Sequence, residues 1–440
     1  MKPLRIPISF ALAAACTLAL APAAAQLPAA EPVRPFATTA TTAAATTTTA
    51  TAEAATAAAT TTNTTTTSAG IEFPAPVRPA PALGVRRLDA TTGRFLASYG
   101  SGEAVLTLDA RLQKKLERTL TDYDVPYGAT VLLDPRTGRV LAMAEHSRSE
   151  PRATNLSLRA ISPAASIFKI VTAAALLEQG YSPDQPVCYH GGNHRLAPRM
   201  LKDDTRRDNA CLPLSAAFGH SANVVFAKLA DRGLTPEVLR ATADRFLFNA
   251  TIPFPSPVER SRAEIPADRF GLANTAAGFG DVRLSALHAA MLGAVIANHG
   301  VLVRPWVVEL VQGDEPAPPL LEPLRIIDER VADALGGMMR ATVTGGTAQK
   351  AFARPPRELR GVSVAGKTGS LNEQKPFRDH TWFVGYAPAE DPQVVVATVV
   401  VNGPLWRVRA PWVAREALAA YFADHVAEVT VASPRRLAAR

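Results

Sequence analysis

A Thr/Ala-rich tract from about Ala37 to Ser68 sets the outer limit of any folded domain in this 440-residue chain. The tract has no apolar periodicity, no aromatic residue after Phe36 and almost no charge, so it cannot bury a hydrophobic core. Pro-rich sequence continues to about Pro81 and stiffens the chain. We therefore predict a disordered tether over residues 26–84, a folded body over residues 85–430 and a basic tail over residues 431–440.

The residues that precede the tether indicate export. A short basic start, Met1–Arg5, is followed by an apolar, Ala-rich stretch that ends with the small residues Ala23–Ala25. This arrangement is typical of a secretory signal peptide. An uncleaved membrane anchor is the alternative, because residues 6–25 approach the ~20 residues that span a bilayer. Residues 1–25 are thus predicted to be a signal peptide or an anchor, with the folded body in the periplasm or cell envelope.

The composition suits an ordinary globular protein, with 47% hydrophobic and 20% charged residues. The net charge of +8 is compatible with contact to an anionic envelope or membrane surface. No Lys/Arg tract with interleaved aromatic residues occurs, so we predict no nucleic-acid partner.

Strands are expected at both ends of the folded body and helices between them. Residues 109–120 read as an amphipathic helix behind an Asp cap, residues 128–146 as two strands around a turn, and residues 160–350 as mostly helical. Three further strands and a closing helix are expected within 362–370, 380–388, 393–401 and 411–422. The fold class is therefore α/β of the α+β type: one antiparallel sheet built from both ends of the chain, flanked by helices, with a mainly helical subdomain.

The first candidate for chemistry is Ser166-Ile-Phe-Lys169, at the start of an apolar helix. A serine hydroxyl needs a base within hydrogen-bond reach to become a nucleophile. A spacing of three residues places Lys169 on the same helical face as Ser166. Apolar neighbours would desolvate the Lys169 ammonium, which lowers its pKa and makes a neutral amine available as the base.

The second candidate is Ser221-Ala-Asn223, immediately before another helix. A hydroxyl and an amide two residues apart on a loop can both point into a cleft, where one relays a proton and the other holds a substrate amide. An ordinary helix cap has the same pattern.

The third candidate is Lys367-Thr368-Gly369-Ser370, on a strand. Gly369 allows close approach of another backbone, as a strand that receives an extended peptide requires. Lys367 supplies positive charge, and the hydroxyls of Thr368 and Ser370 can bind a substrate carboxylate.

Each of these motifs is common, but their order and their element types together are specific. The triple pattern resembles the penicillin-binding proteins and their serine β-lactamase relatives. The resemblance extends from about Ala104 to Phe422 and includes GATVLLDPRTGRVLAMA, AGFGDVRLSALHAAMLGAVIANHG, TGGTAQKAF and HTWFVGYAPAEDPQVVVATVVV. Residues 85–430 are therefore identified as a penicillin-binding transpeptidase domain of the β-lactamase/transpeptidase-like fold.

The resemblance implies a role for each motif residue. Ser166 attacks the carbonyl of the penultimate D-alanine of a peptidoglycan stem peptide, and Lys169 takes its proton. Ser221 and Lys367 pass a proton to the leaving amine, and Asn223 orients the peptide. Thr368 and Ser370 bind the terminal carboxylate, and the backbone N–H groups of Ser166 and Ser370 form the oxyanion hole. Ser370 stands where many transpeptidases carry threonine, which keeps the hydroxyl.

The implied partners are peptidoglycan stem peptides and β-lactam antibiotics, and no cofactor or metal is predicted. Only about residues 70–103 separate the tether from the catalytic domain, too few for the glycosyltransferase or N-terminal module of larger family members. A separate glycosyltransferase or wall-synthesis scaffold is therefore a candidate partner.

Other functions compete with D,D-transpeptidation. A D,D-carboxypeptidase and a serine β-lactamase share the same motifs and differ in how the acyl-enzyme is resolved. A non-catalytic β-lactam sensor would need a cytoplasmic part, but only about five residues precede the apolar segment. Gly219-His-Ser-Ala-Asn223 lacks the final glycine of an esterase elbow, so an esterase is rejected.

Cys188 and Cys211 flank a polar loop and would meet an oxidising compartment after export, so they are a candidate disulfide. The loop also contains His190 and His194, so a zinc site is one alternative and free thiols are another. The spacing lacks the paired pattern of strong zinc sites and favours the disulfide.

Overall fold

The computed structural model describes residues 64–66, 72–74, 79–192, 195–313 and 321–431. The predicted signal peptide or anchor (1–25), most of the predicted tether (26–84) and the predicted tail beyond residue 431 lie outside the described residues. Within the described residues, no helix combines the length and the apolar character needed to cross a membrane.

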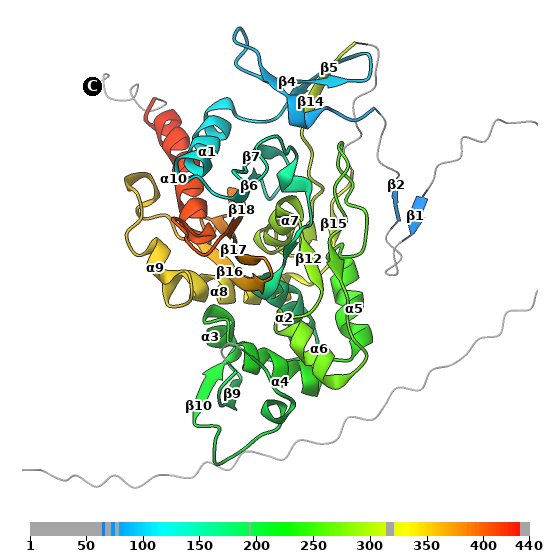
Figure 1. The fold of residues 1–440 in the computed structure, drawn as a ribbon, viewed down its shortest axis with the longest axis vertical. Coiled ribbons are helices and arrows are strands. Elements are labelled where there is room, and N and C mark those ends of the chain that lie inside the picture. The colour runs from blue at the N-terminus through cyan, green and yellow to red at the C-terminus, as the bar shows by residue number, and fades with distance from the viewer. Residues whose placement is uncertain (1–63, 67–71, 75–78, 193–194, 314–320, 432–440) are drawn as a thin grey trace, which may run out of the picture. The chain divides into compact units, whose positions relative to one another are not determined.

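A five-stranded antiparallel sheet forms the centre of the fold (Figure 1). Its strand order is β16-β17-β18-β6-β7, so three strands from late in the chain and two from early in the chain form one sheet. The predicted architecture is confirmed. β16 is an edge strand. The strands are β6 (Tyr127–Leu133), β7 (Val140–His146), β16 (Ala365–Gln374), β17 (Phe377–Ala387) and β18 (Val394–Asn402).

The middle strand, β18, is buried on both faces of the sheet. All nine of its residues are buried. Because successive side chains of a strand point to opposite faces, Val395 and Val399 join one hydrophobic core while Val396 and Val400 join the other. A nearly continuous apolar run is therefore what this position requires.

Helices α1 (Ala110–Asp122) and α10 (Ala410–Val431) pack on one face of the sheet, as Figure 1 shows. The side chain of Asp109 accepts hydrogen bonds from the first turn of α1, which confirms the predicted cap. The other face is covered mainly by α7 (Ala286–Ala297), whose twelve residues are all buried, together with α2 (Lys169–Glu178) and α8 (Glu329–Thr344).

The middle of the chain is largely helical, as predicted. Its further helices are α3 (Leu214–Gly219), α4 (Asn223–Gly233), α5 (Pro236–Arg245) and α6 (Arg269–Ala276), and α9 (Gln349–Phe352) follows α8. The short 3-10 helices are η1 (Leu83–Val85), η2 (Leu156–Leu158), η3 (Ala165–Phe168), η4 (Pro198–Leu201) and η5 (Arg357–Leu359).

Several short strands were not predicted, because each pairs with a partner distant in sequence or is too short to show a period. A second sheet has the order β14-β5-β4-β3, from β3 (Arg87–Leu88), β4 (Phe95–Tyr99), β5 (Gly102–Leu106) and β14 (Val308–Gln312). The small remaining pairings involve β8 (Ser162–Pro163), β9 (Pro186–Tyr189), β10 (Ala210–Pro213), β11 (Arg262–Ala263), β12 (Val282–Leu284), β13 (Val301–Leu302) and β15 (Leu324–Arg325).

The boundary expected between tether and folded body at residues 84 and 85 falls inside a packed segment. Leu83 is only 2% exposed and belongs to the main core. The Ser256 hydroxyl donates to the Pro81 carbonyl at 2.8 Å, and the Ala82 N–H donates to the Ser98 carbonyl. Further upstream, β1 (Thr64–Thr66) pairs with β2 (Glu72–Pro74), also within the range expected to be unstructured.

Candidate active site

Ser166 lies on the 3-10 turn η3, immediately before α2. The preceding residue, Ala165, has φ +48°, a left-handed conformation that costs energy for a residue with a Cβ. Gly278, with φ +94°, packs directly against this turn: a Cβ there would lie 2.6 Å from the Ala165 carbonyl oxygen. The local backbone is thus strained and held from outside.

Lys169 is the first residue of α2, and its Nζ atom is 2.9 Å from Ser166 Oγ. The same Nζ donates to Asn223 Oδ1 at 2.7 Å and to the Ala277 carbonyl oxygen. A neutral amine has two N–H donors and one lone pair. Since the two carbonyl-type oxygens accept both donors, the lone pair is left for the Ser166 hydroxyl.

The surroundings of Lys169 favour that neutral form. Its side chain is fully buried, and burial holds its pKa well below the usual lysine value, with a further lowering from the positive charge of Lys367. The Phe226 ring centroid is 5.5 Å from Nζ, and no carboxylate of the described residues bonds to the amine. The desolvation expected from the flanking sequence is therefore present.

Asn223 begins α4, and Ser221 lies in the turn between α3 and α4. Ser221 has φ +56°, and its Oγ atom is buried with no hydrogen-bond partner among the described residues. A buried hydroxyl that has no internal partner is uncommon, and binding of a ligand would supply the missing hydrogen-bond partner.

Lys367 and the three residues after it lie on the edge strand β16, as predicted. Lys367 is fully buried, its Nζ donates to the Thr368 carbonyl at 2.9 Å, and the Phe218 ring centroid is 5.4 Å away. Burial lowers the pKa of Lys367 to about 7. Two buried lysines with lowered pKa values thus occupy one site.

Gly369 brings β16 close to the turn that carries Ser166. A Cβ at Gly369 would lie 3.2 Å from both the Ala164 carbonyl oxygen and the Ile167 side chain. Ser370, the next residue, is exposed. The close approach that the sequence suggested for this glycine is to the nucleophile turn itself.

Thr347 was not among the residues singled out from the sequence, although it lies in the TGGTAQKAF segment. Its hydroxyl is 2.5 Å from the Thr368 hydroxyl, and its N–H donates to the Gly219 carbonyl at 3.0 Å. Thr347 therefore connects the turn that carries Ser221 to the strand that carries Thr368. Ala277 could not be identified from the sequence, because it accepts from Lys169 through its backbone carbonyl and not through its side chain.

Cys188 and Cys211 lie opposite each other on β9 and β10 and form a disulfide. A disulfide leaves no thiolate to bind zinc. His190 contacts Asp208, which in turn pairs with the fully buried Lys228. His194 lies outside the described residues.

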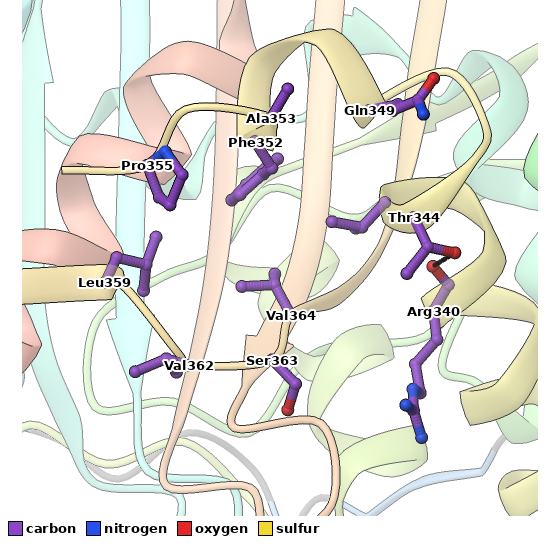
Figure 2. Close-up of a pocket in the computed structure, with 11 residues that line it drawn as sticks. Arg340, Thr344, Gln349, Phe352, Ala353, Pro355, Leu359, Val362, Ser363 and Val364 are labelled. Carbon is purple, nitrogen blue, oxygen red and sulfur yellow. Dashed lines mark hydrogen bonds between the residues drawn. The ribbon is translucent and has the colours of Figure 1, made fainter. Parts of the chain in front are cut away.

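A separate cavity of about 380 Å³ lies between the end of α8, α9, η5 and the residues just before β16. Figure 2 shows the polar side chains Arg340, Thr344 and Gln349 on one side of it and the apolar Leu359 and Val362 on the other. None of the motif residues lines this cavity.

Solved structures similar to this fold include a D,D-transpeptidase domain and penicillin-binding proteins. The D,D-transpeptidase domain of a peptidoglycan glycosyltransferase from Eggerthella lenta has a TM-score of 0.61 and 24% identity, and the alignment covers 84% of this chain and 99% of that one. Penicillin-binding protein A from Mycobacterium tuberculosis, as a ceftriaxone acyl-enzyme complex, has a TM-score of 0.61 and 22% identity, covering 77% and 95%. These identities establish likeness of fold.

Sequence relatives point to the same family. A peptidoglycan D,D-transpeptidase PbpA from Mycolicibacterium smegmatis is 31% identical in an alignment of length 319 that covers 63% of this chain and 62% of the relative. The PbpA of Mycobacterium tuberculosis is 27% identical over 371 residues, covering 73% and 71%. The family described as penicillin binding protein transpeptidase domain matches residues 128–419, more than half of the chain. The chain therefore belongs to the penicillin-binding protein transpeptidase family.

Proposed function

We propose that this protein is a serine D,D-transpeptidase that acts on D-Ala-D-Ala stem peptides of peptidoglycan and is acylated by β-lactams. One observation carries the proposal: a fully buried Lys169 amine lies 2.9 Å from Ser166 Oγ with two carbonyl-type acceptors for its own protons. This geometry supports the assignment of Ser166 as the nucleophile and Lys169 as its base. The names of the PbpA relatives support the same activity.

In the acylation step, Ser166 Oγ attacks the carbonyl carbon of the penultimate D-alanine, and its proton passes to the lone pair of Lys169. The tetrahedral intermediate then collapses, the C–N bond breaks, and the terminal D-alanine leaves as an amine. That amine needs a proton. Ser221, whose hydroxyl has no partner among the described residues, and Lys367, whose pKa is about 7, are the groups we assign to its delivery.

The negative charge of the intermediate is assigned to the backbone N–H groups of Ser166 and Ser370. One comes from the start of a helix and the other from an edge strand, and both are places where a folded chain can leave backbone N–H groups for a ligand. Fixed donors of this kind typically contribute ~3 kcal/mol to the transition state.

The remaining roles concern substrate binding. Thr368 and Ser370 hydroxyls, beside the Lys367 charge, are assigned to the terminal carboxylate of the stem peptide, and Asn223 to a peptide amide. Gly369 keeps β16 free of a side chain where it meets the nucleophile turn. A second stem peptide then supplies the amine that resolves the acyl-enzyme and forms the cross-link.

The proposal also includes the location of the protein and a partner protein. We infer a location in the periplasm or cell envelope, because the relatives are named for peptidoglycan and the sequence begins with an export pattern. We also propose that a separate glycosyltransferase or a wall-synthesis scaffold is a partner of this protein.

The experiment that tests the function combines a fluorescent penicillin with the purified chain and follows covalent labelling and the lifetime of the label, with Ser166→Ala beside the wild type. We expect a Ser166-dependent label that persists for many minutes. A label lost within seconds, with hydrolysed drug, would identify a β-lactamase instead. Stem-peptide dimers, as opposed to trimmed monomers, then distinguish transpeptidation from D,D-carboxypeptidation.

A further inference from the structure

The proposed oxyanion hole depends on two segments that are not neighbours in sequence. Ser166 follows β8, while Ser370 lies on β16. The backbone of β8 pairs with β12, and the Ala164 N–H donates to the Val282 carbonyl. Among the described residues, no backbone hydrogen bond joins residues 162–166 to β16. Close packing at Gly369 and hydrogen bonds from side chains must therefore set the distance between the two N–H groups.

Two side chains of β17 make that connection. Trp382 Nε1 donates to the Pro163 carbonyl at 2.9 Å, and His380 Nδ1 is 3.2 Å from Ser162 Oγ. In the sheet register, Trp382 lies opposite Gly369 and His380 opposite Leu371, so the two residues bracket the position of Ser370. Because residues 380 and 382 share one face of the strand, both reach β8 from the same side.

The second ring nitrogen of His380 is engaged as well. Nε2 is 3.1 Å from the carboxylate of Glu373, at the far end of β16. Glu373 also accepts from Arg283 at 3.3 Å, and Arg283 donates to the Ile161 carbonyl at 2.8 Å. His380 is only 2% exposed. It thus bridges β16 and the strand that leads into Ser166.

The chemistry of the partners assigns the tautomer. A carboxylate only accepts, so Nε2 carries the proton that bonds Glu373. Nδ1 then has a lone pair and accepts from the Ser162 hydroxyl. A protonated imidazole would carry N–H groups on both sides, so Nδ1 would donate and the Ser162 hydroxyl would have to turn and accept. Protonation of His380 therefore reverses the direction of the Ser162 hydrogen bond.

We propose that His380 is a positioning residue for acylation: its neutral imidazole, bridging Glu373 and Ser162, fixes the Ser166 turn against β16 and so sets the geometry of the oxyanion hole. The inference rests on the proposed acyltransferase function. Ala165 has an unfavourable φ, so the turn would relax if the hold on β8 were released. A displacement of ~1 Å at reacting groups can cost about 100-fold in rate.

Protonation supplies a readout that a merely structural role lacks. Burial lowers the His380 pKa, while the facing Glu373 carboxylate raises it and the charges of Arg283 and Arg378 lower it, and the pKa lies below the usual histidine value. In acid His380 becomes charged and the direction of the Ser162 bond reverses, so we expect the wild-type acylation rate to fall relative to a variant whose residue 380 does not titrate. A glutamine at this position can donate to Glu373 and accept from Ser162 but does not titrate.

The test measures second-order acylation rate constants for a fluorescent penicillin on the purified full chain between pH 5 and pH 8. The variants are His380→Phe, His380→Gln and Ser162→Ala, and Asp379→Asn is the matched control. Asp379 is the adjacent buried residue on β17, but it faces the other side of the sheet and pairs with Arg409 at 2.9 Å. Loss of the Asp379 carboxylate should lower the melting temperature without changing a contact to β8.

We expect His380→Phe and Ser162→Ala to acylate about tenfold or more slowly at pH 7.5, and His380→Gln to recover most of the rate. The ratio of wild-type to His380→Gln rates should fall toward the acidic end of this range, where His380 becomes charged. Rates in His380→Phe and Ser162→Ala equal to wild type would overturn the inference, as would an equal loss in Asp379→Asn. If His380→Phe does not fold, Ser162→Ala and the pH ratio decide. A wild type that is not labelled would instead contradict the proposed function.

Discussion

At the scale of single residues, the site depends on two lysines that the fold keeps out of water. Lys169 and Lys367 are both fully buried, and neither has a carboxylate partner among the contacts that their Nζ atoms make with described residues. Burying an ammonium without a counter-ion is unfavourable, so the protein shifts both groups toward the neutral amine. This arrangement serves proton transfer at the expense of stability.

The stability cost gives a prediction for Lys367→Met. The Lys367 pKa is about 7 when folded and 10.5 in the reference state, so between these pH values the unfolded chain binds the extra proton and wild-type stability rises with pH. Removing the group removes this term, on the order of a few kcal/mol at pH 7. We expect a higher melting temperature than wild type at pH 7, a smaller difference at pH 9.5, and strongly reduced acylation.

Thermal unfolding at the two pH values checks whether the variant melts above or below the wild type, and penicillin labelling checks the loss of acylation. A variant that melts below the wild type at both pH values would show that the buried amine stabilises the fold. In that case the burial of Lys367 would not lower the stability of the folded protein.

At the scale of elements, the nucleophile turn is held by close backbone packing. Gly278 approaches the turn that carries Ser166, and Gly369 approaches it from β16. The 3-10 turn η3 places Ser166 and Lys169 at the junction with α2, so the two reactive atoms meet across one helical turn. The precision of the site thus depends on segments that contribute no reactive side chain.

Gly278→Ala should disturb this packing, and the chain offers a matched control. Gly278 and Gly180 both have positive φ, +94° and +87°, but a Cβ at Gly278 meets the Ala165 backbone at 2.6 Å while one at Gly180 meets nothing within 4 Å. We expect Gly180→Ala to cost about 1 kcal/mol and to keep its acylation rate. Gly278→Ala should slow acylation at least about tenfold. Equal rates in the two variants would show that the turn tolerates displacement.

At the scale of the whole molecule, the fold joins segments that lie far apart in the chain. β6 pairs with β18, and β5 pairs with β14, so residues from about 80 to 146 are incorporated into sheets completed by much later strands. The segment before residue 85 takes part through Leu83 and the carbonyl of Pro81. The folded unit therefore begins upstream of the boundary that composition suggested.

A comparison of chains that start at residue 79 and at residue 85 tests this boundary. The shorter chain loses the buried Leu83 and the hydrogen bonds to Pro81 and Ala82. We expect its free energy of unfolding to be lower by about 2 to 4 kcal/mol. Its acylation rate should not change, because these residues do not contact the site. Equal stability in denaturant titrations would place the boundary at residue 85 after all.

The sequence by itself determined the architecture and the motif residues. Local patterns were sufficient, because an Asp cap, an amphipathic period and continuous apolar strands act over a few residues. Helix α1 and strands β6 and β18 formed where these patterns predict them, and α10 includes the predicted 411–422 but continues to Val431. The spacing of Ser166 and Lys169 likewise follows from one helical turn.

Tertiary structure alone decided what surrounds those residues. The Ala277 carbonyl accepts from Lys169, Thr347 joins Thr368, and His380 reaches Ser162 across 218 positions of sequence. Backbone carbonyls carry no sequence signal, and a contact between distant segments leaves none in a single chain. The lowered pKa values of the two lysines also depend on tertiary structure, because burial by the assembled fold, and not the residue type, shifts each amine toward its neutral form.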